Sequence, residues 1–275
     1  MMRLATLLVL TLALAGPALA MPLPPVPDWS WTFDGDGTAF TGGHDASPHG
    51  DGVSYDADTP LGRPGDQALR LAGSSDYLAA PGMNGLLNGL SRLTIAVWIR
   101  SDDGTDVERP FLGLRSPGND DNGGMRYDDK GWVNPSLDDV VKVSLGIDGA
   151  KHAYETGTSG VQTTDWQHVA MVWESGVGMK VYLDGLYEPP DGSSDFPTDG
   201  LVTDQDLFLV GTGPKGHTGS TWDGRIDELA VWTAALDADQ VAWLCEHSVA
   251  QTPEPATLGL LGLGALALAR RRRRR

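Results

Sequence analysis

Hydrophobic and polar positions alternate in short segments along the middle of the chain. In residues 93–99 every odd-numbered position is aliphatic, and in residues 166–174 the side chains of Val169, Met171 and Trp173 share one face. A period of two residues is typical of a β-strand with one buried face. Comparable segments lie between clusters of Gly, Asp, Pro and Ser at 68–72, 140–147, 179–183, 207–210 and 225–232. This pattern predicts a domain of many short strands.

One internal segment predicts a helix instead. Asp237 is followed three residues later by a glutamine, which resembles a capping box, and Val241, Leu244 and Cys245 then form one apolar stripe. Cys245 is therefore expected to be a small buried hydrophobic residue. Many strands with a single short helix near the end of the domain indicate an all-β, two-sheet antiparallel jelly-roll sandwich. No linker divides residues 28–249, so we expect one domain there.

The first 20 residues have the features of a secretory signal peptide. Arg3 is followed by the apolar residues Leu4–Ala15, and Ala18-Leu19-Ala20 forms an A-x-A cleavage site. Twelve apolar residues are too few for a helix that spans a membrane. We therefore expect a short hydrophobic targeting helix, removed by cleavage after Ala20, and an exported mature chain.

The other end carries a second targeting segment over residues 252–275. Pro253-Glu254-Pro255 precedes the apolar run Leu258–Ala269, six arginines follow, and the predicted helix covers Ala256–Ala269. Fourteen helical residues extend about 21 Å, less than the ~30 Å hydrocarbon core of a bilayer, but flanking arginines can snorkel to the cytoplasmic face. The segment is therefore predicted to hold the chain transiently in the inner membrane by a short transmembrane helix.

This order of motifs resembles the PEP-CTERM sorting signal of Gram-negative bacteria. The resemblance implies that an exosortase, a membrane transpeptidase, cleaves near Pro253–Pro255 and sends the product to the cell surface or the extracellular matrix. An ordinary tail anchor is the alternative.

The composition of the chain argues against nucleic acid as a partner and against stabilisation by disulfides. The 275 residues have a net charge of −17, and without the terminal cations and Glu254 the remaining 13 basic and 36 acidic residues give −23. So acidic a body is not expected to bind nucleic acid by neutralising phosphates. The single cysteine excludes an intramolecular disulfide framework.

Several segments, in this order, resemble the LamG-like jelly-roll domains of the concanavalin A-like lectin/glucanase superfamily. They are residues 68–71, 76–78, 93–99, 166–170, 181–185 and 222–232. The resemblance extends over residues 29–247 and implies the fold. It does not determine the activity, because this fold carries lectins, adhesion modules and glycosidases.

The same resemblance implies a structural Ca²⁺ site. Asp45, in the Gly-rich loop of residues 42–52, matches the aspartate of the family loop, and Asp227 matches the aspartate of the late Gly-x-Ile-Asp strand. Ca²⁺ prefers six to eight hard oxygen ligands, which carboxylates and loop carbonyls supply. The alternative is that Asp45 caps a turn and Asp227 pairs with Arg225 or Arg70.

A long polar loop predicted at residues 116–131 is the candidate ligand site. Carboxylates, amides and neighbouring aromatic rings suit a sugar, whose hydroxyl groups form hydrogen bonds while one ring face stacks. The candidate residues are Asp120, Asp121, Asn122, Tyr127 and Trp132. The alternative is a surface insertion in which Trp132 is half-buried.

Catalytic residues cannot be assigned from the sequence. The Glu-x-Asp-x-x-Glu pattern of the superfamily's glucanases does not occur, and the adjacent acids Asp227 and Glu228 point to opposite faces of a strand. We therefore expect a non-catalytic exported module that binds extracellular polysaccharide or a surface protein. The alternatives are a glycan-processing enzyme on the same fold and a purely structural matrix protein.

Overall fold

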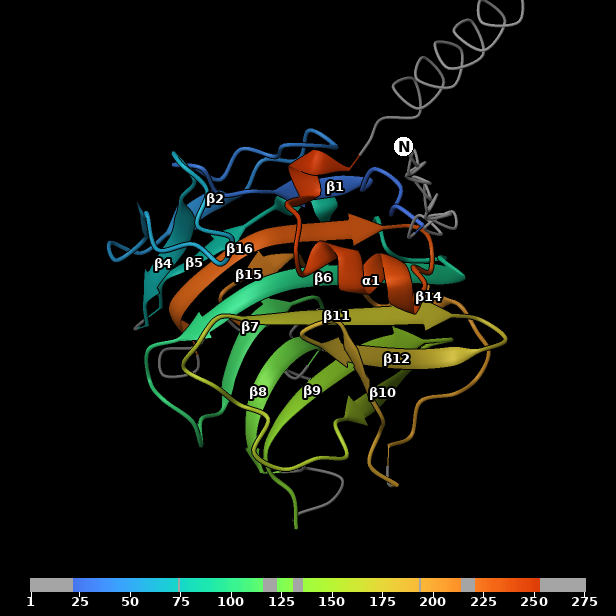
Figure 1. The fold of residues 1–275 in the computed structure, drawn as a ribbon. Helices are drawn as coiled ribbons and strands as arrows, with labels where there is room; N and C mark the ends of the chain where they lie inside the picture. The colour runs from blue at the N-terminus through green and yellow to red at the C-terminus, as the bar shows by residue number, and fades with distance from the viewer. Residues whose placement is uncertain are drawn as a thin grey trace, which may run out of the picture.

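Two antiparallel sheets form the fold (Figure 1). The computed structural model describes residues 22–73, 75–115, 123–130, 136–192, 194–213 and 221–252. The first sheet has the order β13 (Leu186–Glu188), β12 (Gly178–Leu183), β11 (Gln167–Glu174), β6 (Arg92–Ser101), β16 (Asp223–Trp232), β4 (Ala68–Ala72) and β3 (Ser54–Asp56), with β1 (Trp29–Trp31) paired to β16.

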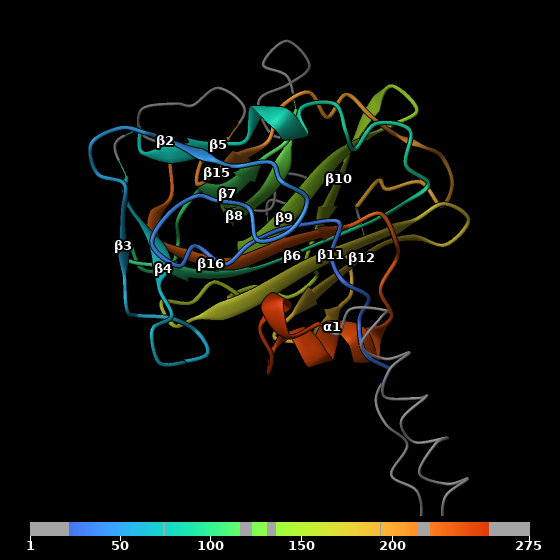
Figure 2. The same cartoon turned by 90° about the horizontal axis from the view of Figure 1, so that it is seen from above.

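The second sheet lies behind the first (Figure 2). Its order is β10 (Ala150–Glu155), β9 (Asp138–Ile147), β8 (Gly124–Lys130), β7 (Arg109–Gly113), β15 (Leu209–Val210), β5 (Tyr77–Ala79) and β2 (Ser47–His49), with β14 (Val202–Thr203) paired to β9. Three short helices complete the described elements: η1 (Pro81–Met83), α1 (Ala238–Leu244) and η3 (Val249–Gln251).

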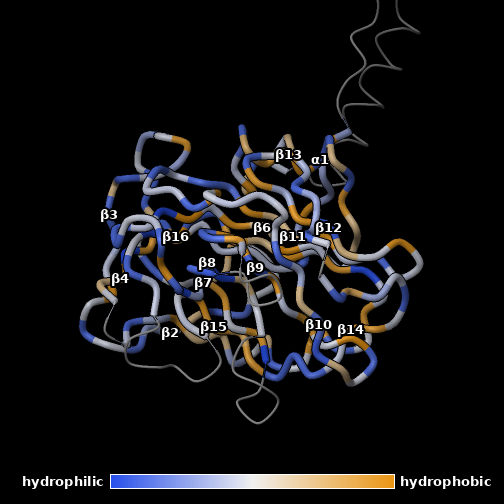
Figure 3. Tube along the Cα trace, turned by 90° about the horizontal axis from the view of Figure 1, so that it is seen from below, coloured by the Kyte–Doolittle hydropathy of each residue, from blue (hydrophilic) through white to orange (hydrophobic). Residues whose placement is uncertain are grey.

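The main core lies between the two sheets. Leu93, Ile95, Val97 and Ile99 of β6 all belong to it, which confirms the alternation seen in the sequence. Figure 3 shows hydrophobic positions along the central strands and hydrophilic positions in many of the connecting loops. Burial of these side chains contributes roughly 1.5–3 kcal/mol each.

The other face of the first sheet is also covered. Ala96 of β6 and Ala170 of β11 belong to a second apolar cluster together with Val241 and Leu244 of α1. The alternation had predicted one buried face, but α1 packs on the opposite one (Figure 2). Small residues at these positions allow the helix to approach the sheet closely.

The ends of α1 agree with the sequence prediction, with one difference. The Asp237 side chain accepts a hydrogen bond from the backbone N–H of Gln240, and the Gln240 side chain accepts one from the backbone N–H of Asp237. Cys245 was expected to be a small buried residue, and the structure shows it as the C-cap residue, partly buried. The seven-residue helix ends one position before it, which places Cys245 outside the helical apolar stripe.

Candidate functional site

A row of charged side chains crosses the outer face of the second sheet, the face turned away from the first sheet. Arg126 of β8 is paired in register with Lys142 of β9, which is paired with Glu155 of β10. Their strand neighbours, such as Val141 and Val143, point into the core, so these three side chains point outward. Nevertheless Lys142 is 1% exposed and Glu155 is 0% exposed.

Ion pairs connect this row. Lys142 Nζ lies 3.3 Å from Glu155 Oε1 and 3.7 Å from Asp128 Oδ2. Arg126 Nε lies 3.4 Å from Asp128 Oδ2, and Arg126 Nη2 contacts the carboxylate of Glu108. Burial raises the pKa of Asp128, although Arg126 and Lys142 oppose this effect, and burial lowers the pKa of Lys142. The outer face therefore holds a desolvated charge network, which is a costly arrangement for stability alone.

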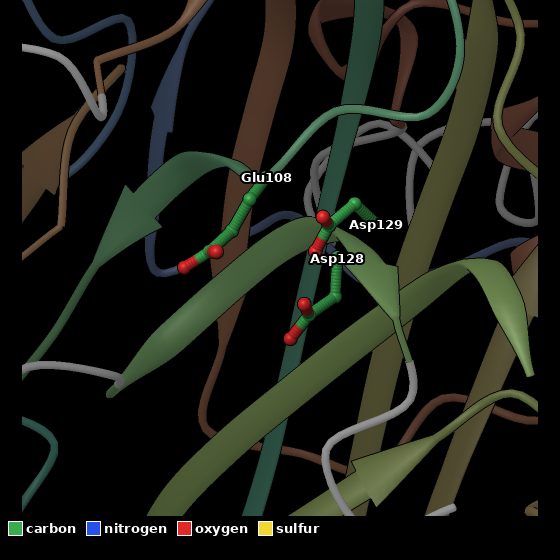
Figure 4. Close-up of side chains that lie close together, drawn as sticks. All are labelled: Glu108, Asp128 and Asp129. Carbon is green, nitrogen blue, oxygen red and sulfur yellow. The ribbon is translucent and has the colours of Figure 1, made fainter. Parts of the chain in front are cut away.

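Three acids of this region lie close enough to suggest a metal ion. The carboxylates of Glu108, Asp128 and Asp129 offer oxygen atoms within 4.8 Å of one another, at the start of β7 and near the end of β8 (Figure 4). However, Arg126 pairs with Glu108, and both Arg126 and Lys142 lie beside Asp128. Two cations thus already offset part of the negative charge of these three acids, and the geometry of the group alone does not define a metal site.

Next to the charged row lies a second row of small side chains. Gly124, Ser144 and Ala153 are aligned across β8, β9 and β10. The hydroxyl of Ser144 is buried and has no hydrogen-bond partner. Arg115, which follows β7, is 3% exposed, and its Nε and Nη1 atoms likewise have no hydrogen-bond partner. The outer face of the second sheet therefore combines the row of charged side chains with polar atoms of Ser144 and Arg115 that are able to form further hydrogen bonds.

The sequence itself carries a signal for this polar face of the second sheet. Lys142 stands inside the apolar segment 140–147, and Arg126 and Asp128 alternate with Met125 and Tyr127. A charge at every second position of a buried strand marks a polar face.

Most of the predicted ligand residues fall outside the described part of the chain, and one is corrected. Asp120, Asp121, Asn122 and Trp132 lie outside the described residues. Tyr127 is a core residue, 0% exposed, with its ring against Phe111 and Trp222. Its hydroxyl donates a hydrogen bond to Gln167 Oε1 (2.7 Å). Its ring therefore offers no face to a ligand, because β8 turns this side chain toward the first sheet.

Asp45 and Asp227 have different surroundings. Asp45 Oδ1 accepts a hydrogen bond from the backbone N–H of Ala39 (2.9 Å), six residues earlier, so this carboxylate connects two parts of its loop. The carboxylates that act on Asp227 include those of Glu228, Asp66 and Asp34. The two arginines named in the alternative pair with other aspartates: Arg225 with Asp56, Asp58 and Asp102, and Arg70 with Asp102 and Asp223. Among the described contacts, neither arginine therefore pairs with Asp227.

The Asp227 carboxylate is the most perturbed acid of this group. Its Oδ1 accepts a hydrogen bond from the backbone N–H of Glu228 (2.8 Å), whereas its buried Oδ2 has no hydrogen-bond partner. Burial first, and then the charges of Glu228 and Asp66, raise its pKa well above the usual range. Arg63 pairs with Asp66 (3.3 Å) and Glu228 (2.6 Å). One guanidinium thus faces four carboxylates, counting Asp34, so the group carries excess negative charge if all are ionised.

A cysteine–histidine contact lies on the face of the first sheet that α1 covers, the face turned away from the second sheet. Cys245 Sγ is 3.3 Å from His168 Nδ1, although the two residues are 77 positions apart. Burial raises the pKa of the Cys245 thiol to about 12 and lowers the pKa of His168 to about 3. The pair is therefore neutral near pH 7, whereas a nucleophilic cysteine needs a thiolate. The interpretation of His168 as a hydrogen-bonded structural residue in a strand agrees with this geometry.

The predicted processing residues Ala20, Pro253, Glu254 and Pro255 lie outside the described residues, as do both apolar targeting segments. Among the residues that are described, none of the helices has the length and apolar character needed to cross a bilayer.

Comparison with known proteins identifies the class. Residues 72–242 match the concanavalin A-like lectin/glucanases superfamily, and the chain belongs to this family. Residues 251–274 match the PEP-CTERM protein-sorting motif, which directs bacterial proteins to export and to the cell surface and implies processing by an exosortase. Both resemblances inferred from the sequence are thereby confirmed. No curated protein matches the chain.

Solved structures of the same fold are distant in sequence. Domain 4 of AbnA, an extracellular GH43 arabinanase from Geobacillus stearothermophilus solved with arabinotriose, is 20% identical with a TM-score of 0.53, covering 80% of this chain and 98% of that one. The botulinum neurotoxin serotype D ligand binding domain, solved with N-acetylneuraminic acid, is 13% identical with a TM-score of 0.54, covering 80% and 50%. The chain thus spans about half of the neurotoxin chain. These similarities show the fold alone.

Proposed function

We propose that this exported protein binds a saccharide on the outer face of the second sheet, within the extracellular polysaccharide of a Gram-negative bacterium. The observation that supports the proposal is a set of buried polar side chains on this outer face. Ser144 and Arg115 have atoms without hydrogen-bond partners, beside the network of Arg126, Lys142 and Glu155. Saccharide hydroxyl groups both donate and accept hydrogen bonds, so they can satisfy such a surface.

The related folds support a saccharide over a protein ligand. Arabinotriose is bound in the arabinanase structure and N-acetylneuraminic acid in the neurotoxin structure, as their descriptions state. A protein interface usually has an apolar centre with aromatic anchors, whereas the outward-pointing residues of β8, β9 and β10 include Arg126, Asp128, Lys142, Ser144 and Glu155. We therefore expect a saccharide as the ligand. Binding to a surface protein is the other outcome that the experiment can reveal.

A glycan array with the mature chain tests the proposal, with Ser144→Ala as the informative variant. This hydroxyl has no partner in the protein, so its removal should leave the melting temperature unchanged. Loss of one hydrogen bond to a ligand should weaken saccharide binding about three- to tenfold. Ser54→Ala, at an exposed position of β3 in the other sheet, is the control. Absence of binding to any saccharide, or equal binding by wild type and Ser144→Ala, would count against the site.

Cleavage of a glycan is the second candidate function. Asp128 and Glu155 lie on the same face with Lys142 between them, and burial raises the pKa of Asp128 in the direction that a general acid requires. Binding is the better-supported role because both carboxylates already form ion pairs with Lys142. Release of reducing ends from a bound polysaccharide, lost in both Asp128→Asn and Glu155→Gln, would reverse this preference.

We also propose a structural Ca²⁺ at Asp227, beside the carboxylates of Asp66 and Asp34 that act on it. The unpartnered Oδ2 of Asp227 and the excess of carboxylates over Arg63 are the features that fit a hard cation. When bound, the ion would neutralise this group and connect the segments that carry these residues.

Chelation tests the calcium proposal. Calcium at 100 times its dissociation constant should stabilise the fold by about 2.7 kcal/mol, which is roughly 5–11 °C for a domain of this size. Asp227→Asn should remove the difference between EDTA and calcium, whereas Asp45→Asn should retain it. A melting temperature that is equal in EDTA and calcium would refute the site.

A further inference from the structure

Arg115 is unusual among the described arginines because its buried guanidinium has few acceptors and no close carboxylate among the described residues. Its guanidinium is buried, and two of its three nitrogen atoms have no hydrogen-bond partner among the described residues. Within the same part of the chain, its ion-pair partner is Asp204, whose Oδ2 lies 3.9 Å from Nη2. By comparison, the closest ion pair of Arg63 is 2.6 Å and that of Arg225 is 2.8 Å. A guanidinium has five N–H donors in one plane, and burial without acceptors is costly.

The fold holds this side chain in place from two directions. A Cβ atom added to Gly123 would lie only 2.1 Å from Arg115 Cγ, so the backbone at Gly123 sits directly against the aliphatic stem. Asp204 is itself held, because Thr203 Oγ1 donates a hydrogen bond to Asp204 Oδ2 (3.1 Å). The guanidinium is therefore positioned by packing rather than by ion pairing.

Arg115 also lies on the outer face of the second sheet. Leu114 belongs to the core, so the next residue of an extended segment points outward. Asp204 lies beside Gly146, which follows Ser144 by two positions on the same face of β9. Arg126 and Lys142 already pair with Glu108, Asp128 and Glu155, whereas among the described residues Arg115 has only the distant Asp204.

We propose that Arg115 binds the carboxylate of an acidic saccharide, and that uronate-containing chains are the ligand class of the outer face. The inference rests on the saccharide-binding function proposed above. A planar carboxylate can accept two parallel hydrogen bonds from a guanidinium, and the unpartnered Nε is one of the donors available for such a pair. A sulfate ester shares this chemistry and is the other source of an acidic group.

The net charge of −23 that remains without the terminal cations and Glu254 does not prevent such binding. At physiological ionic strength charges are screened beyond about 8 Å. A buried guanidinium is screened much less than surface carboxylates, so local contact decides affinity. The overall charge should instead slow association and make it faster at higher salt.

Calorimetry with matched oligosaccharides tests the inference on the mature chain. The probes are oligosaccharides of galacturonate, mannuronate and glucuronate, the same oligosaccharides after reduction of their carboxyl groups, and a sulfated galactan oligosaccharide. We expect at least one uronate series to bind wild type ten- to a hundredfold more tightly than its reduced counterpart. Arg115→Gln should abolish this preference, and Arg115→Lys should retain part of it.

Arg92→Gln is the matched control, because Arg92 is exposed and pairs with Glu174 on the first sheet. It should keep the wild-type preference, so a general effect of charge is separated from recognition. Equal binding of acidic and reduced oligosaccharides overturns the inference while the saccharide-binding function stands. Binding to neither refutes both proposals, and a preference for the sulfated probe alone identifies the sulfate ester as the acidic group. A preference that Arg115→Gln and Arg115→Lys both leave unchanged also overturns the role of Arg115.

Discussion

Replacing His168 with glutamine is expected to flatten the loss of stability that acidification causes. His168 lies on β11, fully buried, with its ring edge-on against Trp98 and its Nδ1 beside Cys245. Burial lowers its pKa to about 3 in the folded protein. In the unfolded chain a histidine titrates near 6.5.

The sign of the effect follows from proton linkage. Below pH 6.5 the unfolded chain binds a proton at this position and the folded protein does not, so stability is lost as the pH falls toward 3. One pH unit of such a difference is worth 1.36 kcal/mol. From pH 7.5 to pH 5.0, His168 should therefore remove about 2 kcal/mol of stability, roughly 4–8 °C in melting temperature for a domain of this size.

Urea unfolding between pH 7.5 and pH 5.0 measures this contribution. Buried carboxyl groups with a raised pKa, such as Asp227 and Asp128, act in the opposite direction. The informative quantity is therefore the difference between wild type and His168→Gln at each pH, which cancels those groups. His49→Gln, at an exposed position of β2, is the control. Parallel pH profiles for wild type and His168→Gln would refute the reasoning.

Three other predictions concern buried groups. Glu228→Ala should destabilise the domain by about 1–3 kcal/mol in urea unfolding, because it leaves the Val249 backbone N–H (2.7 Å) without its acceptor and removes one of the two ion pairs of Arg63; an unchanged free energy of unfolding would contradict this role. Tyr127→Phe should cost about 1 kcal/mol through its bond to Gln167 and leave saccharide binding intact, whereas lost binding would restore Tyr127 as a ligand residue. Cys245, with its pKa raised to about 12, should react with iodoacetamide at pH 8 at least tenfold more slowly in the folded than in the unfolded chain, and equal rates by mass spectrometry would show a reactive thiol.

The sequence by itself determined the elements that depend on near neighbours. The alternation in β6, the capping box at Asp237 and the sorting motif at 251–274 are each contained in one short segment. Their physical causes are local: a strand exposes alternate faces, and a cap satisfies the first free N–H groups of a helix. Such features are readable without a structure.

The tertiary structure decided which distant groups meet and which faces are covered. Strand register brings Lys142 between Arg126 and Glu155, and the packing of α1 brings Cys245 to His168. Polar composition alone predicted a loop at residues 116–131, and for this reason Tyr127 was expected at a ligand site. That prediction is wrong for residues 124–130, which form β8 and place Tyr127 between the sheets. Side chains far apart in the sequence acquire their charge environment and their partners only when sheet pairing and layer packing place them together.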